Sequence, residues 1–189
     1  MFKIILASKS KVRKKILDEH SILNEVRHSN VDEDIIKTSL LKENASPEII
    51  SKNLAELKAN KVSITEKDNL VLGADSVIDL DGELISKPNS RQEALVILKK
   101  LNGKKHFLIS SVCISKNGAM VWNYSDKAAL TMKKMTDDEL KNYLKKISDE
   151  TLYAYNVYQI EGEGRKLFLN IEGDENTIMG LPVEKIKKY

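Results

Sequence analysis

Residues 69–80 read Asn-Leu-Val-Leu-Gly-Ala-Asp-Ser-Val-Ile-Asp-Leu, a strand-like apolar run with a break at Gly73-Ala74-Asp75-Ser76. An acid inside an apolar segment costs free energy unless it is paired, hydrogen-bonded or bound to a metal. Asp75 is therefore a candidate for binding a divalent cation or for activating water as a general base. An ordinary turn aspartate between two strands is the alternative, and this segment alone does not separate the two interpretations.

Strand-like runs and turn signals flank this stretch on both sides. Asp81-Gly82 directly follows it, and Asn117-Gly118 separates the apolar runs 106–115 and 119–132. Both dipeptides are typical of two-residue hairpin turns. Further short strands are expected at 2–7, 24–28 and 167–171, with Cys113 as a small buried strand residue.

Helices are expected between these strands, because capping residues precede several segments with helical periodicity. Ser46-Pro47 starts a helix with Ile50, Leu54 and Leu57 on its inner face. Further helices are expected at 11–19, with Val12, Ile16 and Leu17 inward, and after the capping-box sequences 90–93 and 136–139. Strands alternating with helices and followed by hairpins predict a mixed α/β sheet with helices packed on it.

Composition narrows the class of protein. The chain has 189 residues, with 31 Lys+Arg against 28 Asp+Glu and 41% hydrophobic residues, which suits one domain with a substantial core. Because the charges are mixed along the chain, a nucleic-acid partner is not expected. One cysteine excludes a disulfide framework, and no apolar stretch approaches the ~20 residues of a membrane span. The apolar run at 2–7 is too short for a signal peptide, so we expect a cytoplasmic protein.

The first candidate anion site is Ser8-Lys9-Ser10-Lys11-Val12-Arg13, where a strand ends and a helix begins. A helix N-terminus offers free N–H groups, and Ser8, Ser10 and Arg13 add donors suited to a phosphate. The alternative is that a serine caps the helix and that Arg13 lies on the surface.

Further candidates are spread along the chain. Val31-Asp32-Glu33-Asp34 offers metal ligands or is a solvated acidic loop. Lys58 lies at the edge of an apolar helical stripe, and Lys87-Pro88 follows the first hairpin. Glu161, in the glycine-flanked segment 158–164, is suited to reading a base edge or belongs to an ordinary loop. Together, these cations, carboxylates and a helix N-terminus are what a metal–triphosphate site needs.

The order of these motifs resembles the Maf family of nucleoside triphosphate pyrophosphatases. The resemblance covers nearly the whole chain, so 1–189 is expected to be one Maf-like domain. The matching pieces are Leu6-Ala7-Ser8-x-Ser10-x-x-Arg13, Val31-Asp32-Glu33, Leu54-Ala55-x-x-Lys58-Ala59, Gly73-Ala74-Asp75-Ser76-Val77, Gly82 with Lys87-Pro88, His106, Tyr158-x-Ile160-Glu161-Gly162, Ile171-Glu172-Gly173-Asp174 and Gly180-Leu181-Pro182.

The resemblance implies a single elongated α/β domain with a central nucleotide-binding cleft, a homodimer, and a divalent cation such as Mg²⁺ or Mn²⁺. It implies hydrolysis between the α and β phosphates of a nucleoside triphosphate, in nucleotide housecleaning with a link to cell-division arrest. Asp75 then matches the proton acceptor, and Glu33 matches an acid near the metal. The polar residues that match the phosphate side are Ser8, Ser10, Arg13, Lys58 and Lys87.

Three positions that the family ties to base choice are Val12, Ser76 and Glu161 here. The dTTP/UTP branch resembles Arg, Thr and Gln at these places, whereas the 7-methyl-GTP branch resembles Trp, Gln and Glu. A carboxylate only accepts hydrogen bonds, so Glu161 favours the donor edge of a purine. Val12 and the segment Ala154-Tyr155-Asn156 depart from the family pattern. A catalytically weak nucleotide-binding regulator of septum formation is therefore the alternative function.

Overall fold

The computed structural model describes residues 3–154 and 156–189. Seven strands form one mixed sheet in the order β2-β1-β3-β5-β6-β7, with β4 paired to β3. Strand β1 lies parallel to β2 and β3, and the other pairs are antiparallel. The strands are β1 (Ile4–Leu6), β2 (Asn24–Val26), β3 (Leu70–Leu80), β4 (Glu83–Ile85), β5 (Lys105–Lys116), β6 (Ala119–Met132) and β7 (Phe168–Glu172).

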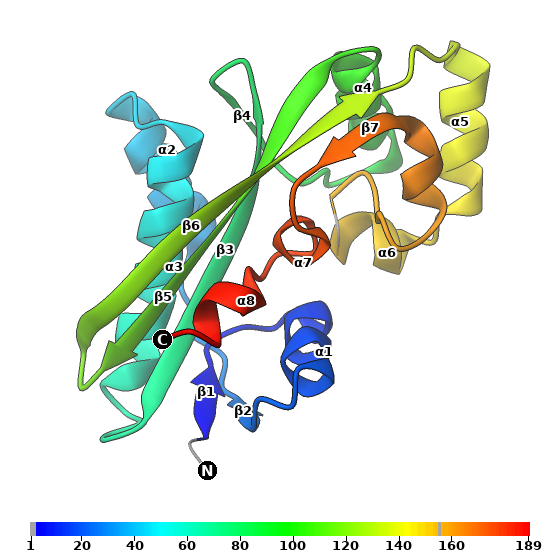
Figure 1. The fold of residues 1–189 in the computed structure, drawn as a ribbon. Helices are drawn as coiled ribbons and strands as arrows, with labels where there is room; N and C mark the ends of the chain where they lie inside the picture. Colours follow the sequence, from blue (N-terminus) through cyan, green and yellow to red (C-terminus); the bar gives the residue numbers. More distant parts are fainter. Residues whose placement is uncertain (1–2, 155) are drawn as a thin grey trace.

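The long hairpin β5–β6 runs along the length of the molecule and gives it an elongated shape (Figure 1). The helices are α1 (Lys11–Glu19), α2 (Glu33–Lys42), α3 (Pro47–Ser63), α4 (Arg91–Leu101), α5 (Asp137–Lys146), α6 (Asp149–Ala154), α7 (Glu175–Ile178) and α8 (Val183–Ile186), with a short 3₁₀ turn at Glu163–Leu167. The predicted mixed α/β sheet with packed helices is confirmed.

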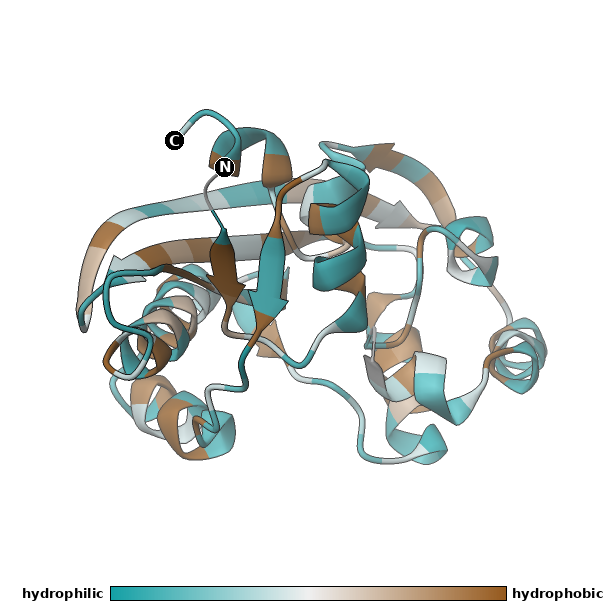
Figure 2. Cartoon of the chain, turned by 90° about the horizontal axis from the view of Figure 1, so that it is seen from below, coloured by the Kyte–Doolittle hydropathy of each residue, from teal (hydrophilic) through white to brown (hydrophobic). Residues whose placement is uncertain are grey.

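Helices cover the sheet on both faces. One face of β3 packs against α3, with α2 beside it. On the other face, α1 and α8 lie at one end, α4 to α6 lie at the far end, and α7 lies between them (Figure 1). In Figure 2, β1 is uniformly apolar, whereas β2 is largely hydrophilic. This contrast follows from position, because β1 is buried inside the sheet and β2 is its half-exposed edge strand.

The expected break at Gly73-Ala74-Asp75-Ser76 is wrong, because β3 continues unbroken through these residues. Gly73 is needed for packing rather than for a turn. A Cβ atom at this position would lie 2.1 Å from the carbonyl oxygen of Ala55 and 2.7 Å from the amide nitrogen of Ala59. The backbone of α3 therefore lies directly against the strand, which fixes the height of the helix above Asp75.

Both hairpin predictions are confirmed by the backbone. Asp81 and Gly82 have φ values of 53° and 86°, and Asn117 and Gly118 have values of 50° and 84°. Positive φ at both central residues is the type I′ conformation, whose twist matches that of the flanking strands.

The helix starts were also predicted well, with two corrections. Ser10, Ser46, Ser90 and Thr136 all act as N-caps, and Thr136 completes a capping box with Glu139. At the 90–93 box, the Glu93 carboxylate accepts instead from the amide of Asn89. Leu57 is 38% exposed, so its assignment to the inner face of α3 is wrong. The inner face is wider and partly polar, because it also contains Ser51 and Lys58.

The edge of β3 has a gap that neither neighbouring strand fills. Strand β1 ends at Leu6, opposite Leu72, and β4 begins its pairing at Ile78. Among the described residues, no strand pairs with 73–77 on this side, although β5 pairs along the whole stretch on the other. Backbone groups in this gap must bond to side chains or ligands, which makes the gap the natural place for a site.

Candidate active site

Asp75 lies in this gap, and its side chain faces α3. It is only 5% exposed, and its Oδ1 atom accepts a hydrogen bond of 2.9 Å from the Lys58 ammonium. Ser51, from the same helix, donates to the Asp75 main-chain carbonyl at 3.2 Å. The second carboxylate oxygen, Oδ2, is buried and has no hydrogen-bond partner among the described residues. Lys58 therefore fixes one oxygen of the Asp75 carboxylate, and the other oxygen remains available to accept a proton or bind a ligand.

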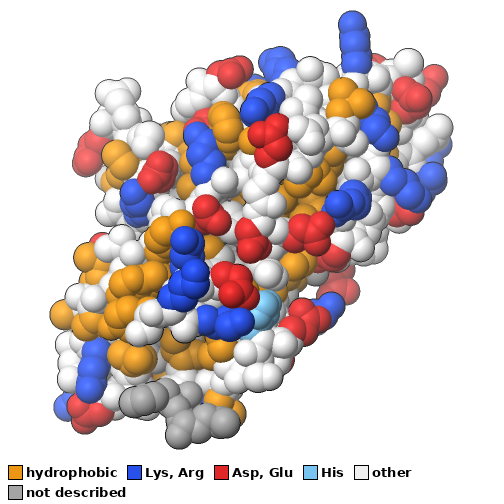
Figure 3. All heavy atoms as spheres, viewed as in Figure 1, with side chains coloured by type: hydrophobic (Ala, Val, Ile, Leu, Met, Phe, Trp, Pro, Cys, Tyr) orange, Lys and Arg blue, Asp and Glu red, His pale blue; other side chains and the backbone are white. Residues whose placement is uncertain are grey.

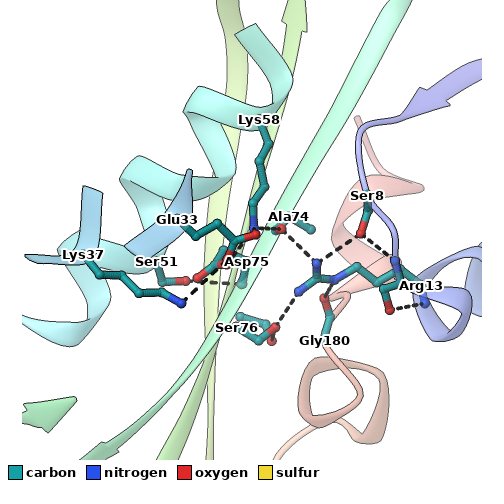
Figure 4. Close-up of polar contacts among 12 residues, drawn as sticks. Ser8, Arg13, Glu33, Lys37, Ser51, Lys58, Ala74, Asp75, Ser76 and Gly180 are labelled. Atoms are coloured by element: carbon teal, nitrogen blue, oxygen red, sulfur yellow. Dashed lines mark hydrogen bonds and ion pairs between the residues drawn. The ribbon is translucent and has the colours of Figure 1, made fainter. Parts of the chain in front are cut away.

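Lys58 joins Asp75 to a second acid. Its ammonium lies 2.9 Å from a carboxylate oxygen of Glu33, at the start of α2, and Lys37 lies 3.6 Å from the other oxygen (Figure 4). Burial alone would raise the pKa of Glu33, but the positive charges of Lys58, Lys37 and Arg13 lower it below its ordinary value. The positive charges around Glu33 thus favour its ionised form, and one buried ammonium bridges Glu33 to Asp75.

The expected solvated loop at 31–34 is wrong, because Asp32 caps α2 and Glu33 is its first residue. No helix was expected at 33–42. The amide of Ile35 donates to the Asp32 side chain, and this cap turns Glu33 toward Lys58. Lys37 was missed, although its i,i+4 spacing from Glu33 would have suggested a pair once a helix was assumed.

Arg13 approaches the gap from the opposite face of the sheet (Figure 4). Its guanidinium donates to the carbonyl oxygens of Gly180 and Ala74 at 2.9 Å each, and to the hydroxyls of Ser76 at 3.1 Å and Ser8 at 3.3 Å. Burial lowers the pKa of Arg13, and the nearby charges of Asp75 and Glu33 oppose that shift. The alternative of a surface arginine is therefore wrong.

The two serines before Arg13 have different tasks. Ser10 is the N-cap of α1, which confirms the alternative that a serine caps this helix. Its hydroxyl accepts a hydrogen bond from the Arg13 amide at 3.3 Å. Ser8 is buried, and its hydroxyl accepts from both the Ser10 amide and Arg13. Ser8 thus belongs to the contacts that hold Arg13 in place.

Lys87 follows β4 and lies within electrostatic range of the same charges. Desolvation and the like charge of Arg13 lower its pKa, whereas Glu33 and Asp75 oppose that effect. Four cations (Arg13, Lys37, Lys58 and Lys87) and two carboxylates therefore share one region of the molecule. On the face shown in Figure 3, acidic and basic side chains are intermixed rather than separated by sign.

The three candidate base-reading positions are not brought together by direct contacts among the described residues. Val12 packs partly against the core cluster beside α1. Ser76 bonds to Arg13 and to Ser110. Glu161 is exposed and accepts a hydrogen bond from Gln159 at 3.0 Å. Of the unusual segment 154–156, Tyr155 lies outside the described residues, and Asn156 adopts a positive φ of 66°.

The donor set fits a hard divalent cation of the Mg²⁺ type. Such ions use one or two protein carboxylates and take their remaining ligands from water and substrate phosphates. Glu33 and Asp75 are two neighbouring carboxylates of this kind, and Oδ2 of Asp75 has no hydrogen-bond partner among the described residues. The described residues contain no cluster of three His, Cys, Asp or Glu side chains that could hold a metal ion.

A two-sided site in a gap of a mixed sheet, with a buried aspartate, a half-buried glutamate and several cations, defines an α/β protein whose site has the charges to bind a polyanion. The model of the Maf-like protein family matches residues 3–189, and the chain belongs to that family.

Curated relatives agree with this assignment. A nucleoside triphosphate pyrophosphatase of Pelagibacter ubique is 72% identical over 186 residues, covering 98% of this chain and 95% of that protein. A 7-methyl-GTP pyrophosphatase of Rhizobium etli is 34% identical, covering 96% of this chain and 91% of that protein. A solved dITP/XTP pyrophosphatase of Mycobacterium abscessus covers 99% of this chain and 92% of its own at 12% identity, with a TM-score of 0.45, too distant to support a functional conclusion. No helix in the described part of the chain is long and apolar enough to cross a membrane.

Proposed function

We propose that this chain hydrolyses the bond between the α and β phosphates of a nucleoside triphosphate, with Asp75 as the general base. As a member of the Maf-like family, and with a 72% identical relative of that activity, the chain is a hydrolase acting on acid anhydrides. One observation carries the role of Asp75. Its carboxylate is buried and held by Lys58 through one oxygen, and its other oxygen has no partner among the described residues.

The proposed reaction follows from that geometry. Asp75 Oδ2 takes a proton from a water molecule whose oxygen attacks the α phosphorus, and the bond to the bridging oxygen breaks. The products are a nucleoside monophosphate and pyrophosphate. Lys58 keeps Asp75 oriented, while Arg13 and Lys87, with Ser8 and Ser10 at the start of α1, form the phosphate side of the site.

Glu33 and Asp75 are the residues that would hold a divalent cation, Mg²⁺ or Mn²⁺, which when bound supplies positive charge for the phosphate oxygens. Lys58 then has a second task, because its single ammonium holds the two carboxylates beside each other before the cation binds.

The base preference is proposed to lie with purines that present N–H donors, of the 7-methyl-GTP kind, rather than with dTTP or UTP. Glu161 carries this proposal, because a carboxylate accepts hydrogen bonds and cannot donate them. Val12 and Ser76 are the other two proposed base-choice positions. A cytoplasmic homodimer that acts in nucleotide housecleaning, with a role in cell-division arrest, completes the proposal, and the mass of the protein in solution tests the dimer.

The experiment is pyrophosphate release from GTP, 7-methyl-GTP, dTTP, UTP and 5-methyl-UTP with Mg²⁺ or Mn²⁺. Wild type should release pyrophosphate, and Asp75→Asn should lower kcat by about 10³-fold, as expected for a lost general base, without changing the fold. Asp79→Asn is the matched control, because Asp79 lies in the same strand but bonds to the Gly82 amide of the hairpin. Nucleotide binding without release across the panel would favour the regulator instead.

A further inference from the structure

A chain of hydroxyl groups leads away from Arg13 across one face of the sheet. Ser76 Oγ accepts from Arg13 at 3.1 Å and lies 2.8 Å from Ser110 Oγ on the neighbouring strand β5. Ser110 in turn donates to the main-chain carbonyl of Thr177 in α7 at 2.7 Å. Ser110 and Thr177 are both fully buried.

The direction of every proton in this chain is fixed. A carbonyl oxygen only accepts, so the single proton of Ser110 goes to Thr177. Ser76 must therefore donate its own proton to Ser110, and it receives one from Arg13. The result is one continuous sequence of donors, from the guanidinium to the C-terminal segment, with no freedom for either hydroxyl to rotate.

The C-terminal segment holds Arg13 at a second point. The Gly180 carbonyl accepts from Arg13 Nε at 2.9 Å, and Gly180 has a φ of 103°, a left-handed conformation that favours glycine. A Cβ atom there would lie 3.0 Å from Ser76 Oγ. Thr177 anchors this segment to β6, because its hydroxyl donates to Asp126 at 2.6 Å.

These contacts occupy most of the N–H donors of the Arg13 guanidinium. Arg has five N–H donors, and four of them serve Gly180, Ala74, Ser8 and Ser76. The described contacts leave one N–H, on Nη2, for a ligand. Nη2 is the nitrogen that Ser76 holds, so Ser76 is one of the contacts that fix the plane of the guanidinium and with it the direction of that last N–H.

We propose that Ser110 is a positioning residue, which fixes Ser76 and thereby directs the remaining Nη2–H of Arg13 toward a phosphate oxygen of the substrate. The inference rests on the proposed function, since it assigns the contact between Arg13 and the triphosphate. Ser110 itself touches no substrate and acts only through its neighbours.

Ser110→Ala tests the proposal. The variant keeps the shape of the site but leaves the Ser76 proton without its acceptor. We expect KM for the preferred triphosphate to rise about tenfold while kcat stays within about twofold, because a binding contact is lost and the general base is untouched. Ser76→Ala should give a similar rise, and the double variant should be no worse than either single variant, because both act through one contact.

Ser115→Ala is the matched control. Ser115 lies in the same strand, is fully buried and donates one hydrogen bond, to Asn60 at 2.6 Å, but it is not connected to Arg13. The thermal stability of Ser115→Ala should fall by about as much as that of Ser110→Ala, but its KM should stay at the wild-type value. A wild-type KM in Ser110→Ala, an equal KM rise in Ser115→Ala, or multiplying effects in the double variant would overturn the proposal.

Failure of the proposed function is a separate outcome. If wild type releases no pyrophosphate from any triphosphate, the dissociation constant of a non-hydrolysable α,β-methylene analogue is measured instead. A tenfold weakening in Ser110→Ala and in Ser76→Ala, but not in Ser115→Ala, then supports the positioning role, and equal binding by all variants contradicts it.

Discussion

Two cations meet at one carbonyl oxygen from opposite faces of β3, and they are held in contrasting ways. Lys58 lies 3.5 Å from the Ala74 oxygen and bonds to two carboxylates, Asp75 and Glu33. Arg13 lies 2.9 Å from the same oxygen, yet the hydrogen-bond acceptors described for it are all neutral. One face therefore contains a compensated charge cluster, and the other presents a positive charge without a direct counter-ion.

This contrast assigns different work to the two faces. Lys58 is bound to the two acids that it orients, so their negative charges largely compensate its positive charge. Arg13 is fixed in direction by neutral groups and keeps its charge for an incoming anion. Burial is the main cause of the lowered pKa of Arg13, and the negative charge of an anionic ligand would oppose that effect. In the proposed mechanism, proton transfer and phosphate binding are therefore separated by the thickness of one strand.

Lys58→Met should cause the largest losses of stability and activity among the variants that test this contrast. It leaves the buried Asp75 carboxylate without its partner, and we expect a loss of about 3 kcal/mol in unfolding free energy at pH 7, together with most of the activity. The pKa of Glu33 should rise, because Lys58 is the main charge that lowers it. The stability gap to wild type should thus narrow as the pH falls below 4.5, the ordinary pKa of Glu33, because wild type then loses the stabilisation that its lowered pKa provides, as urea unfolding across pH would show.

Lys52→Met is the control for that variant. Lys52 lies on the same helix and pairs with Glu48 at 2.6 Å, but both side chains are 45% exposed. An exposed pair of this kind contributes at most about 1 kcal/mol. Equal losses of unfolding free energy in the two variants would mean that Lys58 contributes no more than a surface ion pair. This result would contradict the contrast between the two faces of β3.

His106 extends the comparison of charged groups to a buried titratable side chain that has no ion pair among the described residues. It is fully buried, its Nε2 atom lies 2.9 Å from the Tyr158 hydroxyl, and burial lowers its pKa from 6.5 to about 4. The unfolded chain binds the proton first, so stability should fall by about 3 kcal/mol as the pH drops from 6.5 to 4. His106→Gln should remove most of this dependence. A pH profile unchanged by that substitution would show that His106 does not stay neutral.

Arg13→Lys should give the smallest effect. Lysine keeps the charge but cannot serve four separated acceptors, so we expect a KM rise of about tenfold and a modest loss of stability. Arg91→Lys is the control, since Arg91 also donates to two carbonyls, those of Leu144 and Ile147, away from the site. If both variants bind nucleotide like wild type, Arg13 is a structural residue and its face does not bind phosphate.

Local features were readable from the sequence because they depend on neighbouring residues. Asp81-Gly82 and Asn117-Gly118 require positive φ, and serine and threonine caps satisfy the first amides of their helices, so these elements are where the pattern placed them. The sheet class followed from the alternation of strands and helices. The break at Gly73 was predicted wrongly, because sequence cannot distinguish a glycine needed for a turn from one needed for contact with a helix.

The sequence by itself determined the hairpins, most helix starts and which residues had the chemistry for a triphosphate site: Asp75, Glu33, Lys58, Lys87 and Arg13. Only the tertiary structure decided how they are paired. Residues 42 positions apart, Glu33 and Asp75, share one ammonium because α2 and α3 lie together on one face of the sheet. Ser110, Thr177 and Gly180 gained their connection to Arg13 in the same way. Hydrogen bonds between residues distant in sequence depend on the packing of whole elements, and no local pattern encodes that packing.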